Sequence, residues 1–227
     1  MIIYIWKILI NVLMKDNLVF GYSKKEEQLN VISHAFGLVL SIISFPFLLF
    51  KAFCFVGFWQ QACFIIYGIS LIVLYAASTF YHASKKIELR TNLNIFDHAA
   101  IYVLIAGSYS PLCIIGLNSD LGWYMFCFVW VFALIGIVLK LFFTGKFDKA
   151  STIMYLLMGW QIVVFIKPLI KSLSVEGLYW LIGGGVFYSV GALFYSITKV
   201  AYNHAIFHVF VLLGSFSHFV VIYNLNQ

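Results

Sequence analysis

Two histidines stand four residues apart near the end of the chain, in the apolar stretch AYNHAIFHVF. Residues spaced by four lie on the same face of a helix, so His204 and His208 would point in the same direction. Two imidazoles one helical turn apart can occupy two positions around a metal ion. A third ligand at the same level of the molecule would complete a site of the kind that holds Zn²⁺.

A third histidine and a carboxylate stand at two other polar breaks of the chain. His82 closes the apolar stretch SLIVLYAASTFYHAS, and Asp97 opens NIFDHAAIYVLIAGSYSP. Three protein ligands plus one open position is the pattern of catalytic zinc, although imidazole ligands also suit copper, nickel or iron. Asp97 would orient a ligand or take a proton from water. Ser78 shares a helix face with His82 and could donate a hydrogen bond to an oxyanion.

Simpler roles are weighed for each of these groups, because an i,i+4 histidine pair is also a common hydrogen-bonded feature of helix bundles. His98 faces about 100° away from Asp97 on a helix, so it is interpreted as a packing or hydrogen-bonding residue. His34 is interpreted as a structural residue tied to Asn30, one turn earlier. His218 lies ten residues beyond His208, about 15 Å deeper by helical rise, and is not expected to be a ligand.

The elements that carry these residues follow from an apolar composition. Apolar residues make up 63% of the chain and charged residues 10%, and the mean hydropathy is +1.01. Soluble domains carry about 25% charged residues, so an ordinary soluble domain is excluded. A formal charge of +6 does not indicate nucleic acid, because the basic residues are scattered among short loops. The four cysteines show no CxxC spacing and are interpreted as buried thiols without a metal or redox role.

Polar breaks divide the sequence into seven apolar segments, and each is long enough to cross a bilayer as a helix. The expected fold is all-α: a polytopic membrane bundle of seven transmembrane helices over 29–227, preceded by a cytoplasmic or interfacial leader over 1–28. GGG at 183–185 predicts a close helix contact or a local bend. The expected spans are 29–52, 57–82, 95–117, 121–143, 150–170, 177–198 and 203–223.

The distribution of Lys and Arg predicts the orientation. A cytoplasmic N-terminus leaves only Lys51, Lys167 and Lys171 in outside segments. Such a bias satisfies the positive-inside rule, and seven spans then place the C-terminus outside. The other basic residues fall in the inside segments: Lys7, Lys15, Lys24, Lys25, Lys85, Lys86, Arg90, Lys140, Lys146, Lys149 and Lys199.

The opening MIIYIWKILINVLM is too short to span a bilayer and lacks the features of a signal peptide. Two interpretations are open. The segment lies in the membrane interface as an anchor, or the mature chain begins at Met14, which starts a more usual polar leader. We favour the second.

Four motifs in register resemble the hemolysin III family and the related progestin and adiponectin receptors. EEQLNVISH, which holds Glu27, Asn30 and His34, resembles the E-x-x-N-x-x-[ST]-H segment of the family. Ser78 to His82 resembles the S-x-x-x-H of its second helix, FDHAAIYVLIAGSYSP its third-helix segment, and HAIFH its H-x-x-x-H. Ser110 stands where Thr is common before proline in the family, a small departure.

The resemblance implies a seven-helix bundle with an inside N-terminus and zinc held by His82, His204 and His208. It implies that Asp97 lies against the metal site, with Glu27, Asn30, His34 and His98 in support. In the receptor branch ceramide hydrolysis has been attributed to this site, and bacterial members have been connected with membrane-lipid homeostasis. The hemolysin name implies cytolysis.

These residues and the resemblance are consistent with three functions. The first is a zinc-dependent hydrolase of a lipid amide or ester in the plasma membrane, with an acyl chain entering the bundle. The second is a cytolytic protein that needs no catalysis, although no span shows the continuous polar stripe of a pore. The third is a sensor of membrane state in which zinc is structural, closed by a fourth protein ligand. Membrane lipids are the expected partners; the oligomeric state is not predicted.

Overall fold

The computed structural model of the chain describes residues 21–226. Every regular element in that range is a helix, and seven segments are long and apolar enough to cross a membrane. The all-helical, seven-span fold expected from the sequence is therefore confirmed. The expectations for the opening segment MIIYIWKILINVLM lie outside the described residues.

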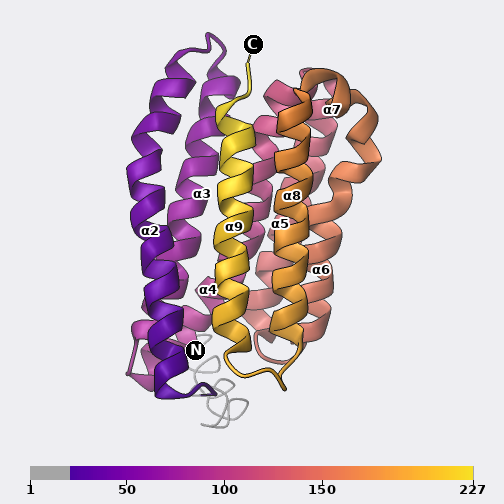
Figure 1. Cartoon of the computed structure of the whole chain (residues 1–227). Helices are drawn as coiled ribbons and strands as arrows, with labels where there is room; N and C mark the ends of the chain where they lie inside the picture. Colours follow the sequence, from indigo (N-terminus) through magenta and orange to yellow (C-terminus); the bar gives the residue numbers. More distant parts are fainter. Residues whose placement is uncertain (1–20, 227) are drawn as a thin grey trace, which may run out of the picture.

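The seven long segments run side by side as one bundle, and α2 begins at the end opposite to the one where α9 finishes (Figure 1). Two spans contain other helix types: a π-helical turn, η2, extends α4, and a 3₁₀ segment, η3, joins α6 to α7. The elements are α2 (Lys24–Phe53), α3 (Phe58–Ala83), α4 (Ile87–Pro111), η2 (Leu112–Leu117), α5 (Asp120–Phe143), α6 (Asp148–Trp160), η3 (Gln161–Phe165), α7 (Ile166–Ser172), α8 (Val175–Ser196) and α9 (Asn203–Tyr223).

The centre of the bundle is the span formed by α4 and η2. Of its most apolar stretch, 78% is buried inside the protein, more than in any other span. Around it, α2 packs against α3 and α9, α3 packs against α4, and α8 packs against α9. The ends of α3, α4 and α9 that carry the candidate site therefore meet around one axis.

Serine caps fix where three of the spans begin. The side chains of Ser23, Ser119 and Ser174 each accept a hydrogen bond from the backbone N–H three residues later. Such a cap satisfies a donor that the first helical turn leaves unpaired. Because Ser23 caps α2, that helix already includes Glu27, ahead of the apolar stretch that begins at 29.

The third span begins earlier than hydropathy predicts. Its start was expected at 95, but α4 begins at Ile87. The expectation was wrong because the first turns of α4 carry polar side chains, including Glu88, Arg90 and Asn94, which resemble a loop in composition. Arg90 and Asn94 are buried inside the protein, and Arg90 is paired with Glu27, so these polar residues face the bundle and do not end the helix.

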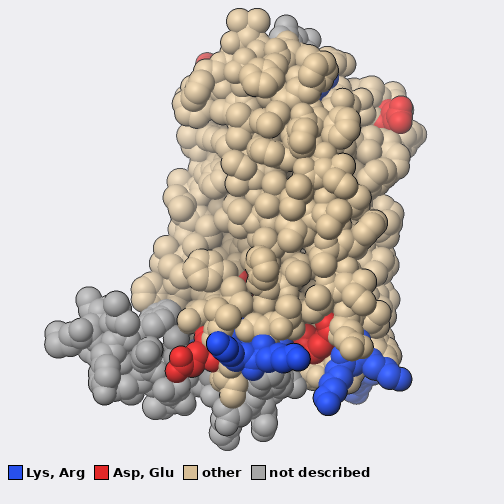
Figure 2. Space-filling view, turned by 90° about the vertical axis from the view of Figure 1, so that its left-hand side faces the viewer, with Lys and Arg blue, Asp and Glu red and all other residues tan. Residues whose placement is uncertain are grey.

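The outer surface is that of a membrane protein. Large apolar side chains point outward along the spans, as Phe36, Phe47 and Phe50 do on α2. Figure 2 shows that most charged side chains on the face in view gather at the end of the bundle where α2 begins. Further charged atoms lie at the opposite end, and the broad band between the two ends is almost uncharged, as expected for a surface that faces a lipid bilayer.

Two local expectations have different outcomes. The close contact predicted for GGG is confirmed at Gly184, where an added Cβ would lie 2.2 Å from the His218 ring. The expectation that every cysteine is buried holds for Cys63 and Cys113 but is wrong for Cys54 and Cys127. Cys54 terminates α2 at the bundle end, and Cys127 lies on the outer side of α5.

Candidate metal centre

Three buried histidines from two helices converge at the end of the bundle where α2 begins. His82 comes from the last turn of α3, and His204 and His208 come from the first turns of α9. One ring nitrogen from each lies within 4.8 Å of the others. The Nε2 atoms of His82 and His204 are 3.2 Å apart. Two imidazoles on a tetrahedral zinc ion, with Zn–N near 2.0–2.1 Å, would place their nitrogens roughly 3.3 Å apart.

A carboxylate determines which nitrogen of His82 is available. Its Nδ1 lies 2.7 Å from Oε2 of Glu27. An ionised carboxylate only accepts hydrogen bonds, so the imidazole must donate through Nδ1–H. Nε2 of His82 then keeps its lone pair and points toward His204. A histidine held by a carboxylate in this way is the usual arrangement of a zinc ligand.

Arg90 neutralises the same carboxylate from α4. Its Nη2 donates to Oε1 of Glu27, and its Nη1 donates to the backbone carbonyls of His82 and Ser84, each at 3.3 Å. The guanidinium also lies 4.8 Å from the centre of the Tyr81 ring. Arg90 therefore connects the first turns of α2 and α4 to the last turn of α3, which carries His82.

A serine determines the tautomer of His208. The Ser33 hydroxyl donates to the Asn30 carbonyl at 3.0 Å and lies 3.2 Å from Nδ1 of His208. Because its proton is used by the carbonyl, the Ser33 oxygen accepts from Nδ1–H of His208. Nε2 of His208 is then the nitrogen left for a metal ion.

Tyr22 covers the third histidine. Its hydroxyl lies 3.0 Å from Nδ1 of His204, and the two ring centres are 4.7 Å apart. Burial raises the pKa of the Tyr22 phenol well above its usual value, so the group is a neutral hydroxyl. It can accept from Nδ1–H of His204, which frees Nε2. In that tautomer the Nε2 atoms of His82 and His204, 3.2 Å apart, both lack a hydrogen and would require a proton or a cation between them.

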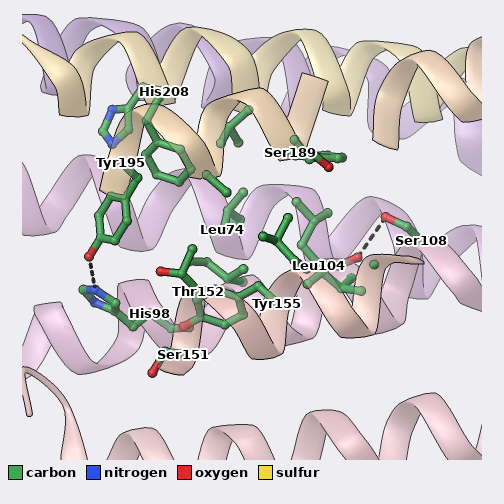
Figure 3. A pocket seen from close by; sticks show the side chains of 18 of the residues that line it. Leu74, His98, Leu104, Ser108, Ser151, Thr152, Tyr155, Ser189, Tyr195 and His208 are labelled. Carbon is green, nitrogen blue, oxygen red and sulfur yellow. Dashed lines mark hydrogen bonds between the residues drawn. The ribbon is translucent and has the colours of Figure 1, made fainter. Parts of the chain in front are cut away.

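Two of the three histidines, His204 and His208, border an apolar cavity of about 140 Å³ inside the bundle. Ser78, Asp97, His204 and His208 all line it. Asp97 is buried, and the Ser78 hydroxyl is buried without a hydrogen-bond partner among the described residues. Figure 3 shows the cavity continuing from His208 past Leu74 and Leu104, between the helices. The site is therefore polar at one end and apolar beyond it.

A second, polar cavity of about 530 Å³ lies at the same end of the bundle. We call it the polar vestibule; its walls include Tyr22, Glu26, Lys149 and Lys199. Thr152 and Tyr195 line both the vestibule and the apolar cavity. The three histidines therefore stand close to the place where a polar compartment meets an apolar one. That is the arrangement an amphiphilic molecule needs.

His98 lies apart from the three converging histidines. Its Nδ1 is 2.8 Å from the Asn94 carbonyl, and its Nε2 is 3.4 Å from the Tyr195 hydroxyl, the contact drawn in Figure 3. The Tyr155 hydroxyl donates to the His98 carbonyl at 2.9 Å. His98 thus holds α4 against α6 and α8.

The expected hydrogen bond between His34 and Asn30 is absent from the described residues. Both ring nitrogens of His34 and both side-chain polar atoms of Asn30 are buried without a hydrogen-bond partner. The His34 ring instead stacks on His208, with centres 3.5 Å apart and planes 17° from parallel, and it meets Tyr75 edge-on. The expected tie to Asn30 is therefore wrong, because the His34 ring packs against His208 and Tyr75 instead. The structural role of His34 stays a prediction.

Sequence reasoning missed the roles of Tyr22 and Arg90 and did not assign Ser33 to His208. A signal for Arg90 was present, since Arg90, Asn94 and Asp97 are spaced by four and three residues and share a helix face. If Arg90 had been interpreted as a buried residue on the same helix face as Asp97, the predicted start of the third span would have moved close to the observed start at Ile87. Tyr22 and Ser33 carry no such pattern, because their roles depend on contacts with α9, more than 170 residues away.

Comparison with known proteins connects this geometry to a family. The family described as haemolysin-III related matches residues 22–219. Hemolysin-3 of Bacillus cereus is 43% identical over 191 residues, covering 84% of this chain and 87% of that protein. The Hemolysin-3 homolog of Bacillus subtilis (strain 168) is 43% identical over 198 residues, covering 87% and 93%. Human monocyte to macrophage differentiation factor is 29% identical over 205 residues, covering 87% and 83%.

The resemblance indicated by the four sequence motifs is thereby confirmed. The match begins at Tyr22, which covers the histidines, and it continues into α9 as far as residue 219. All seven spans and the three converging histidines lie within it or overlap it. The chain is a multi-pass membrane protein that belongs to the haemolysin III-related family.

Proposed function

We propose that the protein is a zinc-dependent hydrolase of a lipid amide or ester in the cell membrane. The observation that carries the proposal is that a cluster of histidines, two further polar side chains and an apolar cavity meet at one point. The nitrogens of His82, His204 and His208 converge, Asp97 and Ser78 line the adjoining cavity, and that cavity is apolar. A metal hydrolase acting on a lipid needs all three.

The donor set fits zinc. Glu27 and Ser33 both accept from Nδ1–H of a histidine, so two Nε2 lone pairs are fixed toward the centre. His82 and His204 already have the spacing of two zinc ligands. Bound Zn²⁺ would act as a Lewis acid on a carbonyl and make water a nucleophile at neutral pH.

The remaining steps belong to side chains of the protein. Asp97 accepts a proton from the attacking water and later returns it to the leaving amine or alkoxide. Ser78 has a buried hydroxyl with no hydrogen-bond partner among the described residues, and it donates to the oxygen that becomes negative during attack. His98 is excluded from these roles by its bonds to Asn94 and Tyr195.

The two cavities accommodate the two halves of a lipid. The acyl chain occupies the apolar cavity, where Leu74, Leu104 and Val211 exclude water from the reacting carbonyl. The headgroup occupies the polar vestibule beside Lys149 and Lys199. Because Thr152 and Tyr195 line both cavities, the proposal puts the scissile bond at the junction, next to the histidines.

The test combines metal content with turnover. Detergent-purified wild type is expected to carry about one zinc per chain, and His208→Ala to lose it. Wild type should release fatty acid from a panel of N-acyl and O-acyl lipids. Asp97→Asn should retain zinc and lose turnover by a factor of about 10² to 10⁴, the usual contribution of a general base. Metal-free, folded wild type would exclude the proposal, and zinc without turnover would favour a structural or sensing role.

A second candidate is membrane lysis, which the names of the Bacillus relatives support. Lysis without catalysis predicts leakage from liposomes that persists in Asp97→Asn and His208→Ala. Lysis that follows lipid hydrolysis predicts leakage that both substitutions abolish. Dye release from vesicles of a hydrolysable lipid and of its ether analogue separates the two, because the ether analogue has no carbonyl to attack.

A further inference from the structure

We propose that the far end of the apolar cavity is a second polar binding site, at His218, for a hydroxyl group carried on the acyl chain. The inference deepens the proposed function and rests on it, since it names the kind of acyl chain that the cavity receives. It predicts a preference for chains hydroxylated far from the carbonyl.

His218 lies on the same stripe of α9 as the candidate metal ligands His204 and His208; the residue itself is half-buried, and both of its ring nitrogens are buried. Successive members of the stripe are three or four residues apart, so they share one helix face. His218 lines the same cavity as His204 and His208. The stripe comprises His204, His208, Val211, Ser215 and His218.

The nitrogens of His218 are unsatisfied. Nδ1 and Nε2 are both buried, and neither has a hydrogen-bond partner among the described residues. The Leu181 carbonyl lies near the ring but does not meet hydrogen-bond geometry. A polar group buried at membrane depth with no partner is costly and in membrane proteins is usually functional. An imidazole offers one donor and one acceptor, and a hydroxyl can bind either.

Neighbouring polar groups are already occupied by one another. The Tyr188 hydroxyl lies 2.9 Å from Ser215 Oγ, which also accepts from Tyr75 at 2.8 Å. Trp160 donates to the Ser189 hydroxyl at 2.9 Å. The His218 ring meets Tyr188 edge-on, with centres 5.3 Å apart, and lies against Gly184. Packing therefore holds the imidazole at the cavity without giving it a hydrogen bond.

The distance between the two polar ends determines the position of the hydroxyl. Ten residues separate His208 from His218, which is about 15 Å along a helix. An extended alkyl chain covers that length with on the order of twelve carbons. The walls between the two ends are apolar, with Leu74, Leu104 and Val211 among them. A hydroxyl near carbon 12 would reach His218, whereas one on carbon 2 would not.

Binding of free fatty acids to the purified, zinc-loaded protein tests the inference without requiring turnover. The probes are stearate, 2-hydroxystearate and 12-hydroxystearate, measured by displacement of a fluorescent fatty acid. One added hydrogen bond predicts that 12-hydroxystearate binds about fivefold more tightly than the other two. Equal affinities in the wild type would overturn the proposal and would mean that His218 is satisfied by water alone.

Variants assign the preference to His218. His218→Phe should bind stearate as well as the wild type and lose the preference for 12-hydroxystearate, and His218→Gln should keep part of it. Ser108→Ala is the matched control, because the Ser108 hydroxyl lines the same cavity but donates to the Leu104 carbonyl. The preference should survive in that variant. A preference for 12-hydroxystearate that persists in folded His218→Phe would overturn the proposal. If His218→Phe does not fold, the comparison of His218→Gln with the wild type takes its place, and an undiminished preference in His218→Gln would overturn the proposal.

Failure of the hydrolase proposal would look different. His204→Ala should abolish turnover while the ratio of the affinities for 12-hydroxystearate and stearate stays at the wild-type value, because His218 is far from the metal ligands. A preference without turnover in the wild type would remove the catalytic proposal and leave the chain-binding site. Turnover without a preference for 12-hydroxystearate would leave the catalytic proposal and remove the chain-binding site.

Discussion

The partner on Nδ1 of each histidine determines which nitrogen is left for a metal ion. Glu27 accepts from His82, Ser33 accepts from His208, and Tyr22 lies against His204. These oxygens come from α2 and the residues just before it, not from the helices that carry the ligands. The first span therefore orients three histidines that other helices carry.

Replacement of Ser33 by alanine tests this role. The change removes the acceptor of His208 Nδ1–H, and loss of such a partner typically lowers metal affinity by about 10- to 100-fold. Zinc affinity measured by competition with a chelator should fall by that factor. Ser44→Ala is the control on the same helix, since the Ser44 hydroxyl donates only to the Ser41 carbonyl. Unchanged affinity in Ser33→Ala would show that His208 is oriented by other contacts.

Residue types and spacing predicted that His82, His204 and His208 would come together, and their ring nitrogens do converge. Polar residues are rare in spans, so His82, Asp97 and the pair on α9 stood out against an apolar sequence. Their meeting followed from chain direction, because alternate helix ends share one side of a membrane. Ring orientation did not follow, and His34 illustrates this. Its stacking on His208 depends on the packing of α2 against α9, which spacing along α2 cannot encode.

Among the elements, α4 shows where hydropathy fails as a guide. Hydropathy reports the cost of placing a side chain in lipid, whereas Arg90 is buried in protein and paired with Glu27. The helix therefore continues through residues that looked like a loop. Most other span limits were predicted closely, because the serines that cap the helices stand next to the positions where the apolar stretches begin.

The glycines of α8 give a prediction at this scale. A Cβ on Gly184 would meet the His218 ring, whereas one on Gly183 would meet nothing within 4 Å. Gly184→Ala should therefore lower the free energy of unfolding by about 1–3 kcal/mol through overpacking. Gly183→Ala should be neutral or stabilise the helix by up to about 1 kcal/mol. Thermal unfolding in detergent measures both, and equal midpoints would contradict the close contact between α8 and α9.

For the whole molecule, seven spans place the beginning of α2 and the end of α9 on opposite sides of a membrane. The bias of basic residues predicts that the beginning of α2, and with it the polar vestibule, faces the cytoplasm. Under the proposed function, a lipid would then be hydrolysed at the inner leaflet.

Cysteine labelling tests this orientation. Cys54 is an exposed thiol at the end of α2, on the predicted outer side. A membrane-impermeant maleimide should label it in intact cells, and Cys54→Ser should abolish the signal. Lys86→Cys in the Cys54→Ser background is the control and should be labelled only after permeabilisation. The opposite pattern would mean that the N-terminus is outside.

The separation of the ligands along the chain has a consequence for biosynthesis. His82 and His204 are 122 residues apart, and a ribosome releases them in that order. When six spans have been made, Glu27, Arg90 and His82 can already associate, but a single imidazole holds zinc poorly. Emergence of the last span then supplies two ligands together. If the proposed function holds, a nascent or prematurely terminated chain would be inert, and the membrane would meet the proposed chemistry only after synthesis is complete.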